Sequence, residues 1–177
     1  MHRYEQTLLI RVVFVFGLLV FVLGCAHQSV RHLNKQPLTG NGTAELTMDY
    51  WTFRYTTEQT EKGLLVQGVA LPKQDAIPVW AKWIDDLWME AYLSDDRDHV
   101  LARHLRVFSS QQLDYAAGIP FSFTLTPERM GSPGPVFVTF GYRMVLTPAE
   151  RASRESTAEV TGGRDVFFAS EGALTRY

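Results

Sequence analysis

Apolar residues recur at every second position along most of the chain after Leu46. In Phe121–Leu125 they alternate with serine and threonine, and in Val136–Leu146 they share one parity over the whole run. This period places alternate side chains on opposite faces of an extended strand, whereas a helix would need apolar residues three or four positions apart. Strands with one apolar face must bury it against another layer. The pattern therefore predicts a layered β fold.

The remaining apolar segments predict further strands separated by turns. Leu64–Leu71 is apolar on both faces, which is typical of a central strand, and Pro72 ends it. Residues 87–108 alternate on both sides of the acidic cluster Ser94–His99, which predicts a hairpin. The alternation changes parity close to Tyr50, which predicts a bulge or bend within one strand. The apolar residues at 166–168 predict a last strand.

Two segments are candidates for short helices. The spacing of Trp80, Trp83 and Leu87 fits a helix, and it fits equally a strand that enters the hairpin. Thr147–Glu150 has the form of a capping box with proline at the first helical position, which predicts a short helix over 148–155. At most one or two short helices are expected.

These elements favour a mainly β chain with a single antiparallel β-sandwich of about seven strands over residues 45–177. A closed barrel of the lipocalin kind is the alternative. The chain has one cysteine, so no disulfide within it stabilises the fold. We expect stability to come from packing of its 4 tryptophans, 7 tyrosines and 11 phenylalanines with the aliphatic residues.

The N-terminus has the form of a secretory signal peptide over residues 1–24. A charged start precedes an apolar run over 12–24, and small Gly24 precedes Cys25. The run is shorter than the roughly 20 apolar residues that a membrane-spanning helix needs, so a retained anchor is the second choice. The following stretch, residues 25–44, is polar and interrupted by proline and glycine. This composition predicts a flexible tether.

The tetrapeptide Val22-Leu23-Gly24-Cys25 resembles the lipobox of bacterial lipoproteins. The resemblance implies cleavage after Gly24 and attachment of lipid, including palmitate, to Cys25. It also implies that Ala26 directs the protein to the outer membrane, where the domain would face the periplasm. The strand patterns of 64–71 and 87–101 resemble those of bacterial immunoglobulin-like and fibronectin-like accessory domains.

No motif in the chain predicts catalysis, a metal site or a cofactor. Asp95, Asp96 and Asp98 lack the spacing of a calcium loop, and they are expected to form a solvated turn. On a strand, His99 and His104 would lie on opposite faces and could not share a metal. No nucleophile elbow or phosphate loop is present. A formal net charge of −2 gives no electrostatic footprint for nucleic acid.

The aromatic residues Trp80, Trp83, Trp88 and Tyr92 are the candidate ligand-binding residues. Dense aromatics form sugar-stacking platforms or protein-binding hot spots, and the alternative is that they build the core. We expect a lipid-anchored, non-enzymatic envelope protein, an accessory or assembly module with an envelope protein partner. A carbohydrate- or peptidoglycan-binding module and a hydrolase whose site the sequence does not reveal are the alternatives.

Overall fold

The computed structural model describes residues 27–40, 42–127, 134–150 and 165–176. By its internal contacts the chain divides into a main unit, Gln28–Leu174, and a second unit made of residues 1–27 and 175–177. The described residues of the second unit are His27, Thr175 and Arg176, which belong to strands. The signal peptide predicted for 1–24 and Cys25 itself lie outside the described residues.

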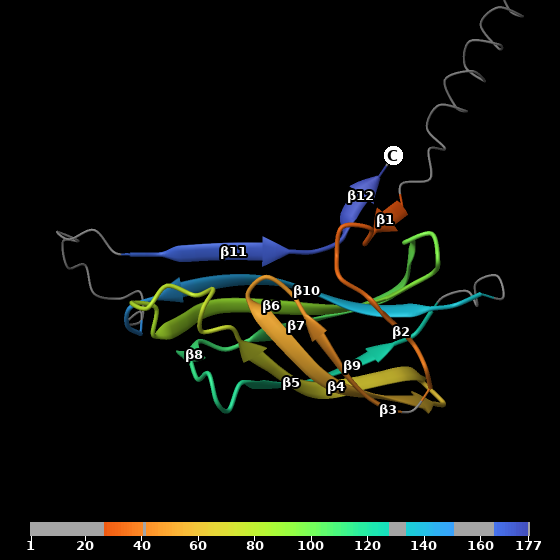
Figure 1. Ribbon diagram of the computed structural model, residues 1–177, viewed down its shortest axis with the longest axis horizontal. Helices are drawn as coiled ribbons and strands as arrows, with labels where there is room; N and C mark the ends of the chain where they lie inside the picture. Colours follow the sequence, from red (N-terminus) through yellow and green to blue (C-terminus); the bar gives the residue numbers. More distant parts are fainter. Residues whose placement is uncertain (1–26, 41, 128–133, 151–164, 177) are drawn as a thin grey trace, which may run out of the picture. The chain divides into compact units, whose positions relative to one another are not determined.

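The main unit is built from two antiparallel sheets (Figure 1). The four-stranded sheet has the order β3 (Gly42–Thr47), β4 (Trp51–Thr60), β5 (Gly63–Pro72) and β9 (Ile119–Leu125). The six-stranded sheet has the order β11 (Phe167–Glu171), β10 (Phe137–Thr147), β6 (Trp83–Ser94) and β7 (Val100–Phe108). Its two short strands are β2 (Gln36–Pro37), which pairs with β10, and β8 (Gln111–Gln112), which pairs with β6. β1 (His27–Ser29) and β12 (Leu174–Arg176) lie outside both sheets.

Aromatic rings from the two sheets meet in the core. The ring of Phe53 on β4 stacks on Phe140 of β10 with 4.2 Å between centroids, and both side chains are fully buried. Trp51 meets Tyr142 edge-on at 6.4 Å across the same interface. The sheets are separate hydrogen-bonded layers that pack through these rings, so the predicted antiparallel β-sandwich is confirmed.

The structure confirms most of the predicted strands. β5 lies between β4 and β9, as its apolar faces indicate, and β6 and β7 form the hairpin over 87–108. Because β6 begins at Trp83, the region around that residue is a strand entering the hairpin.

Two local predictions need correction. At Tyr50 the chain makes a tight turn between two strands rather than a bend within one, and Met48 N–H donates to Trp51 O at 2.8 Å. The helix predicted over 148–155 falls mainly outside the described residues. Its first residues, 148–150, are not helical, and the hydroxyl of Thr147 donates to Ala149 O at 2.9 Å.

The stretch predicted as a flexible tether is largely part of the fold. We call residues 28–40 the N-terminal strap. Val30 is fully buried and Leu33 is 6% exposed, and both belong to the hydrophobic core. Val30 N–H donates to Asp98 O at 3.0 Å, and Leu38 N–H donates to Val136 O at 2.8 Å. The prediction fails because buried side chains and long-range hydrogen bonds order a segment whose local composition is polar.

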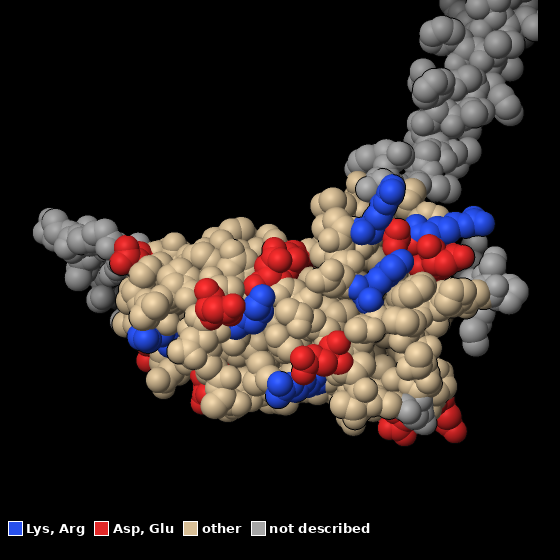
Figure 2. All heavy atoms as spheres, viewed as in Figure 1, with Lys and Arg blue, Asp and Glu red and all other residues tan. Residues whose placement is uncertain are grey.

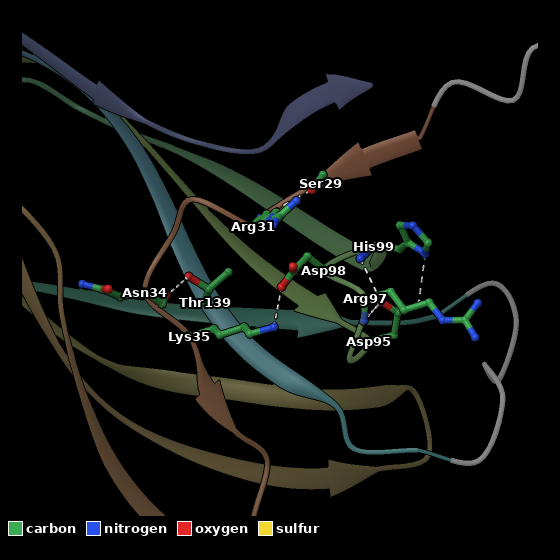
Figure 3. A network of polar contacts seen from close by, with 9 residues as sticks. All are labelled: Ser29, Arg31, Asn34, Lys35, Asp95, Arg97, Asp98, His99 and Thr139. Atoms are coloured by element: carbon green, nitrogen blue, oxygen red, sulfur yellow. Dashed lines mark hydrogen bonds and ion pairs between the residues drawn. The ribbon is translucent and has the colours of Figure 1, made fainter. Parts of the chain in front are cut away.

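The strap is held against the β6–β7 turn by a polar network (Figure 3). Lys35 forms an ion pair with Asp98, and its Nζ lies 4.3 Å from the centroid of the Phe137 ring. Asp98 has a φ of 68°, a left-handed conformation that aspartate tolerates better than most residues. Asp95 Oδ1 accepts hydrogen bonds from the backbone N–H groups of Arg97 and His99 at 2.9 and 2.8 Å. Asp95 and Asp98 thus close the turn and hold the strap.

Candidate functional site

A groove of about 510 Å³ lies on the outer face of the six-stranded sheet. We call it the outer groove, and its lining comes from β6, β7, β10 and the segment from β11 to the start of β12. The lining residues are Trp88, Glu90, Arg103, Leu105, Tyr142, Arg143 and residues 170–174.

Strand register determines which side chains face the outer groove. On β6, Leu87 and Met89 point into the core, so Trp88 and Glu90 point outward. Trp88 lies opposite Arg143 on one side and Val107 on the other. The same face therefore carries alternating aromatic, aliphatic and charged groups on neighbouring strands.

Gly141 on β10 lets the C-terminal segment approach the groove closely. A Cβ at this position would lie 2.9 Å from Glu171 O and 2.9 Å from Tyr92 Cε2. Any larger residue would therefore push the C-terminal segment away from the sheet.

Arg143, which lines the groove, contacts two aromatic rings: Trp88, which also lines it, and Phe168, which lies outside the lining. The guanidinium carbon of Arg143 lies 5.5 Å from the Trp88 ring centroid and 5.8 Å from that of Phe168. Trp88 Nε1 donates to Asp86 Oδ1 at 2.9 Å, and Arg143 Nη2 lies 3.8 Å from Asp86 Oδ2. Each cation–π contact at an exposed site contributes about 0.5–1 kcal/mol. These contacts restrict the rotamers of Trp88 and Arg143 before any ligand binds.

Tyr92 holds the C-terminal segment onto the sheet. Its hydroxyl donates to Glu90 Oε2 and accepts a hydrogen bond from Ala173 N–H at 3.2 Å. Burial, reinforced by the hydrogen bond to Glu90, raises the pKa of Tyr92 well above its ordinary value of 10.0. Tyr92 therefore stays neutral and holds in place the segment whose residues 170–174 line the groove.

Of the four predicted binding aromatics, the structure places only Trp88 in the outer groove with an exposed ring, at 38%. Tyr92 is 1% exposed, so its ring is not available to a ligand. Trp80 is half-buried against the core, and Trp83 is half-buried with its Nε1 donating to Ser110 Oγ at 2.6 Å. The four residues do not form a shared binding surface.

Sequence reasoning missed Arg143 and Phe168. In strands 137–147 and 167–171, Arg143 and Phe168 are exposed, whereas the residues on either side of each are buried or half-buried. Each of the two side chains therefore faces away from its apolar neighbours. Only the register of β11 on β10 and of β10 on β6 brings them to Trp88.

The exposed apolar side chains of the two main sheets gather on this outer face. Trp88, Leu105, Val107 and Phe168 are 38–61% exposed, and all four belong to the six-stranded sheet. In the view of Figure 2, acidic and basic side chains are interspersed over the described surface. On the outer face itself the charged side chains are of both signs, since Arg143 lies near Asp86 and Arg103 lies near Glu90.

A second hollow, of about 670 Å³, lies on the four-stranded sheet around Gly68. Its charged member, Arg54, is paired with Glu45 at 2.7 Å, and its other polar lining side chains are two threonines, a glutamine and the buried Tyr55. None of the large exposed apolar residues of the described chain lies on this sheet. The outer groove therefore has more of the groups used in recognition.

The histidines considered in the sequence have structural roles. His104 Nδ1 accepts a hydrogen bond from Thr124 N–H at 2.9 Å, which joins the edges of β7 and β9. His99 Nδ1 lies 3.3 Å from Asp95 Oδ2 within the β6–β7 turn. In the part of the chain that the structure describes, no three histidine, cysteine, aspartate or glutamate residues are placed to hold a metal ion.

No helix among the described residues has the length and apolar character needed to cross a bilayer. Comparison of the chain with protein-family models, with curated proteins and with solved structures gives no match.

Proposed function

We propose that the protein is a lipid-anchored, non-enzymatic module of the bacterial envelope that binds a protein partner through the outer groove. The proposed anchor is Cys25, on the resemblance of Val22–Cys25 to a lipobox. Acyl chains attached to that residue would hold the domain at the membrane, because each buried methylene contributes about 0.8 kcal/mol. On this proposal the domain lies in the periplasm at the outer membrane.

The observation that carries the binding role is the Trp88–Arg143–Phe168 arrangement. Tryptophan and arginine are enriched among the residues that dominate protein interfaces. Here Asp86 contacts both Trp88 and Arg143, so immobilising these side chains in a complex would cost little conformational entropy. Exposed Leu105 and Val107 extend the apolar part of the same face.

A carbohydrate-binding role ranks lower. Stacking on a sugar chain requires accessible rings in series, whereas Trp88 is the one accessible ring of the four candidates. The guanidinium of Arg143 also lies over that ring. Binding of peptidoglycan fragments to the purified protein, abolished by Trp88→Ala, would favour the carbohydrate role over the protein role.

Site-specific photo-crosslinking in cells tests the proposal. A photoreactive residue at Val107, which is 61% exposed beside Trp88, should give a discrete protein adduct. The matched control is Thr56, an exposed residue on the outer face of the four-stranded sheet. The adduct should disappear in the Trp88→Ala, Arg143→Ala double variant. Equal adducts from both positions, or an adduct that persists in the double variant, would contradict the proposal.

A further inference from the structure

We infer that the end of the sandwich formed by the N-terminal strap and the β6–β7 turn faces phospholipid head groups at the membrane surface. The inference rests on the proposed anchor at Cys25. It adds the orientation of the domain and the surface that lies next to the lipid.

The length of chain between anchor and fold sets the first limit. The fold begins by Ser29, which forms a β-bridge with His99, and Val30 N–H donates to Asp98 O. Four peptide steps separate Cys25 from Ser29. Since an extended residue spans at most about 3.5 Å, Ser29 lies within about 14 Å of the anchored residue. The β6–β7 turn, which is bridged to Ser29, must stay close to the membrane as well.

The opposite end of the sandwich is much farther from the anchor. β6 runs for 12 residues from Trp83 to Ser94, and Lys82 lies just before it. At about 3.3 Å per residue, Lys82 is roughly 40 Å from the turn. Lys82 is part of the fold at that end, because its N–H donates to Thr147 O at 3.0 Å. The turn end must therefore stay near Cys25, whereas the end that carries Lys82 can lie far from it.

The formal net charge gives the domain no overall attraction to anionic lipid that would hold it flat. The formal net charge is −2, and acidic and basic side chains are interspersed in the view of Figure 2. Each surface arginine or lysine contributes only about 1 kcal/mol of attraction to anionic lipid. A domain that lies flat would therefore need several of them together on one face. The short connection is thus the main determinant of orientation.

The turn end carries groups that suit phosphate. Arg31 and Arg97 are exposed, and within the described residues neither has an ion-pair partner (Figure 3). A guanidinium matches the geometry of phosphate oxygens. Lys35 and Asp98 neutralise each other, and Asp95 and the exposed Asp96 balance Arg31 and Arg97, so the turn end offers two guanidiniums without a net positive charge.

The orientation also places the outer groove. Trp88 lies six residues before Ser94 on β6, so the groove is about 20 Å from the turn along the strand. A partner that binds there must itself lie near the membrane surface.

Energy transfer from two labelled positions tests the inference in the full-length lipoprotein. Lipidation consumes the thiol of Cys25, so Asp96→Cys, at an exposed position of the β6–β7 turn, and Lys82→Cys each provide a single free thiol for a fluorescent donor. The proteins are reconstituted in phosphatidylethanolamine–phosphatidylglycerol vesicles that contain a head-group acceptor. Because the positions differ by roughly 40 Å along the strand, transfer from residue 96 should be about twofold or more above transfer from residue 82.

A flexible Gly/Ser insertion of about ten residues between Ala26 and His27 provides the control. Such a linker spans about 17 Å on average and should remove most of the difference between the labels. Equal or reversed transfer in protein whose lipid is verified by mass spectrometry would overturn the orientation and leave the anchor intact. Absence of lipid on Cys25 would overturn the anchor and the orientation together.

Discussion

Replacing Leu33 by alanine should destabilise the domain, because the N-terminal strap is part of its core. Leu33 is 6% exposed within the hydrophobic core, and its N–H donates to Val30 O at 2.9 Å. Burial of a leucine side chain is worth about 1.5–3 kcal/mol, and buried Leu→Ala changes cost about 2–5 kcal/mol once the cavity is included. Since the strap lies at the margin of the core and can partly collapse, we expect a loss of about 2–3 kcal/mol.

Urea unfolding of a chain that begins at Ala26, followed by tryptophan fluorescence, measures this loss. Trp51 is fully buried and should report the transition. In thermal unfolding of the same protein the melting temperature should fall by about 5–10 °C, because a loss of 1 kcal/mol lowers the melting temperature of a domain of this size by roughly 2–4 °C. The control is His32→Ala at the exposed neighbouring position, which should change stability by less than about 0.5 kcal/mol. If Leu33→Ala is as mild as His32→Ala, the strap does not contribute to the core and our reasoning is wrong.

Three further predictions concern packing, the groove and ionisation. Gly68→Ala should cost about 3 kcal/mol or more in urea unfolding, because its Cβ would lie 2.0 Å from Arg54 O, whereas Gly42→Ala, with open space around it, should be nearly neutral. Trp88→Ala should abolish the photo-adduct at the outer groove while changing the unfolding free energy by less than about 1 kcal/mol, and retention of the adduct would count against the site. Burial raises the pKa of Tyr55 from 10.0 to about 12, so the unfolded chain loses its proton first and stability falls as pH rises through 10–12. Tyr55→Phe should reduce that fall by about 1.4 kcal/mol per pH unit within this window, and an unchanged alkaline slope would refute this explanation.

Period-two alternation was sufficient to predict the sandwich and the inward faces of its longest strands. In β10 the predicted apolar face includes Phe140 and Met144, and both are fully buried. The tether prediction failed at Val30 and Leu33 because their partners come from distant parts of the chain. Isolated apolar residues in a polar segment show no period, so composition alone cannot distinguish an ordered strap from a linker.

The candidate site was only partly predictable for the same reason. Trp88 was identified from its place on the less apolar face of a strand, but Tyr92 shares that parity and is buried. The C-terminal segment covers Tyr92, and Ala173 N–H bonds to its hydroxyl. Arg143 and Phe168 come from later strands and reach Trp88 through register, which depends on the pairing of whole strands.

Incorporation of labelled palmitate into the wild-type chain and into Cys25→Ala tests the proposed membrane attachment most directly. The wild-type protein should incorporate the label and fractionate with membranes. The Cys25→Ala variant should incorporate none, because the chain has no other cysteine to accept the lipid. Continued incorporation of palmitate by Cys25→Ala would contradict the proposed anchor and, with it, the short connection between lipid and domain.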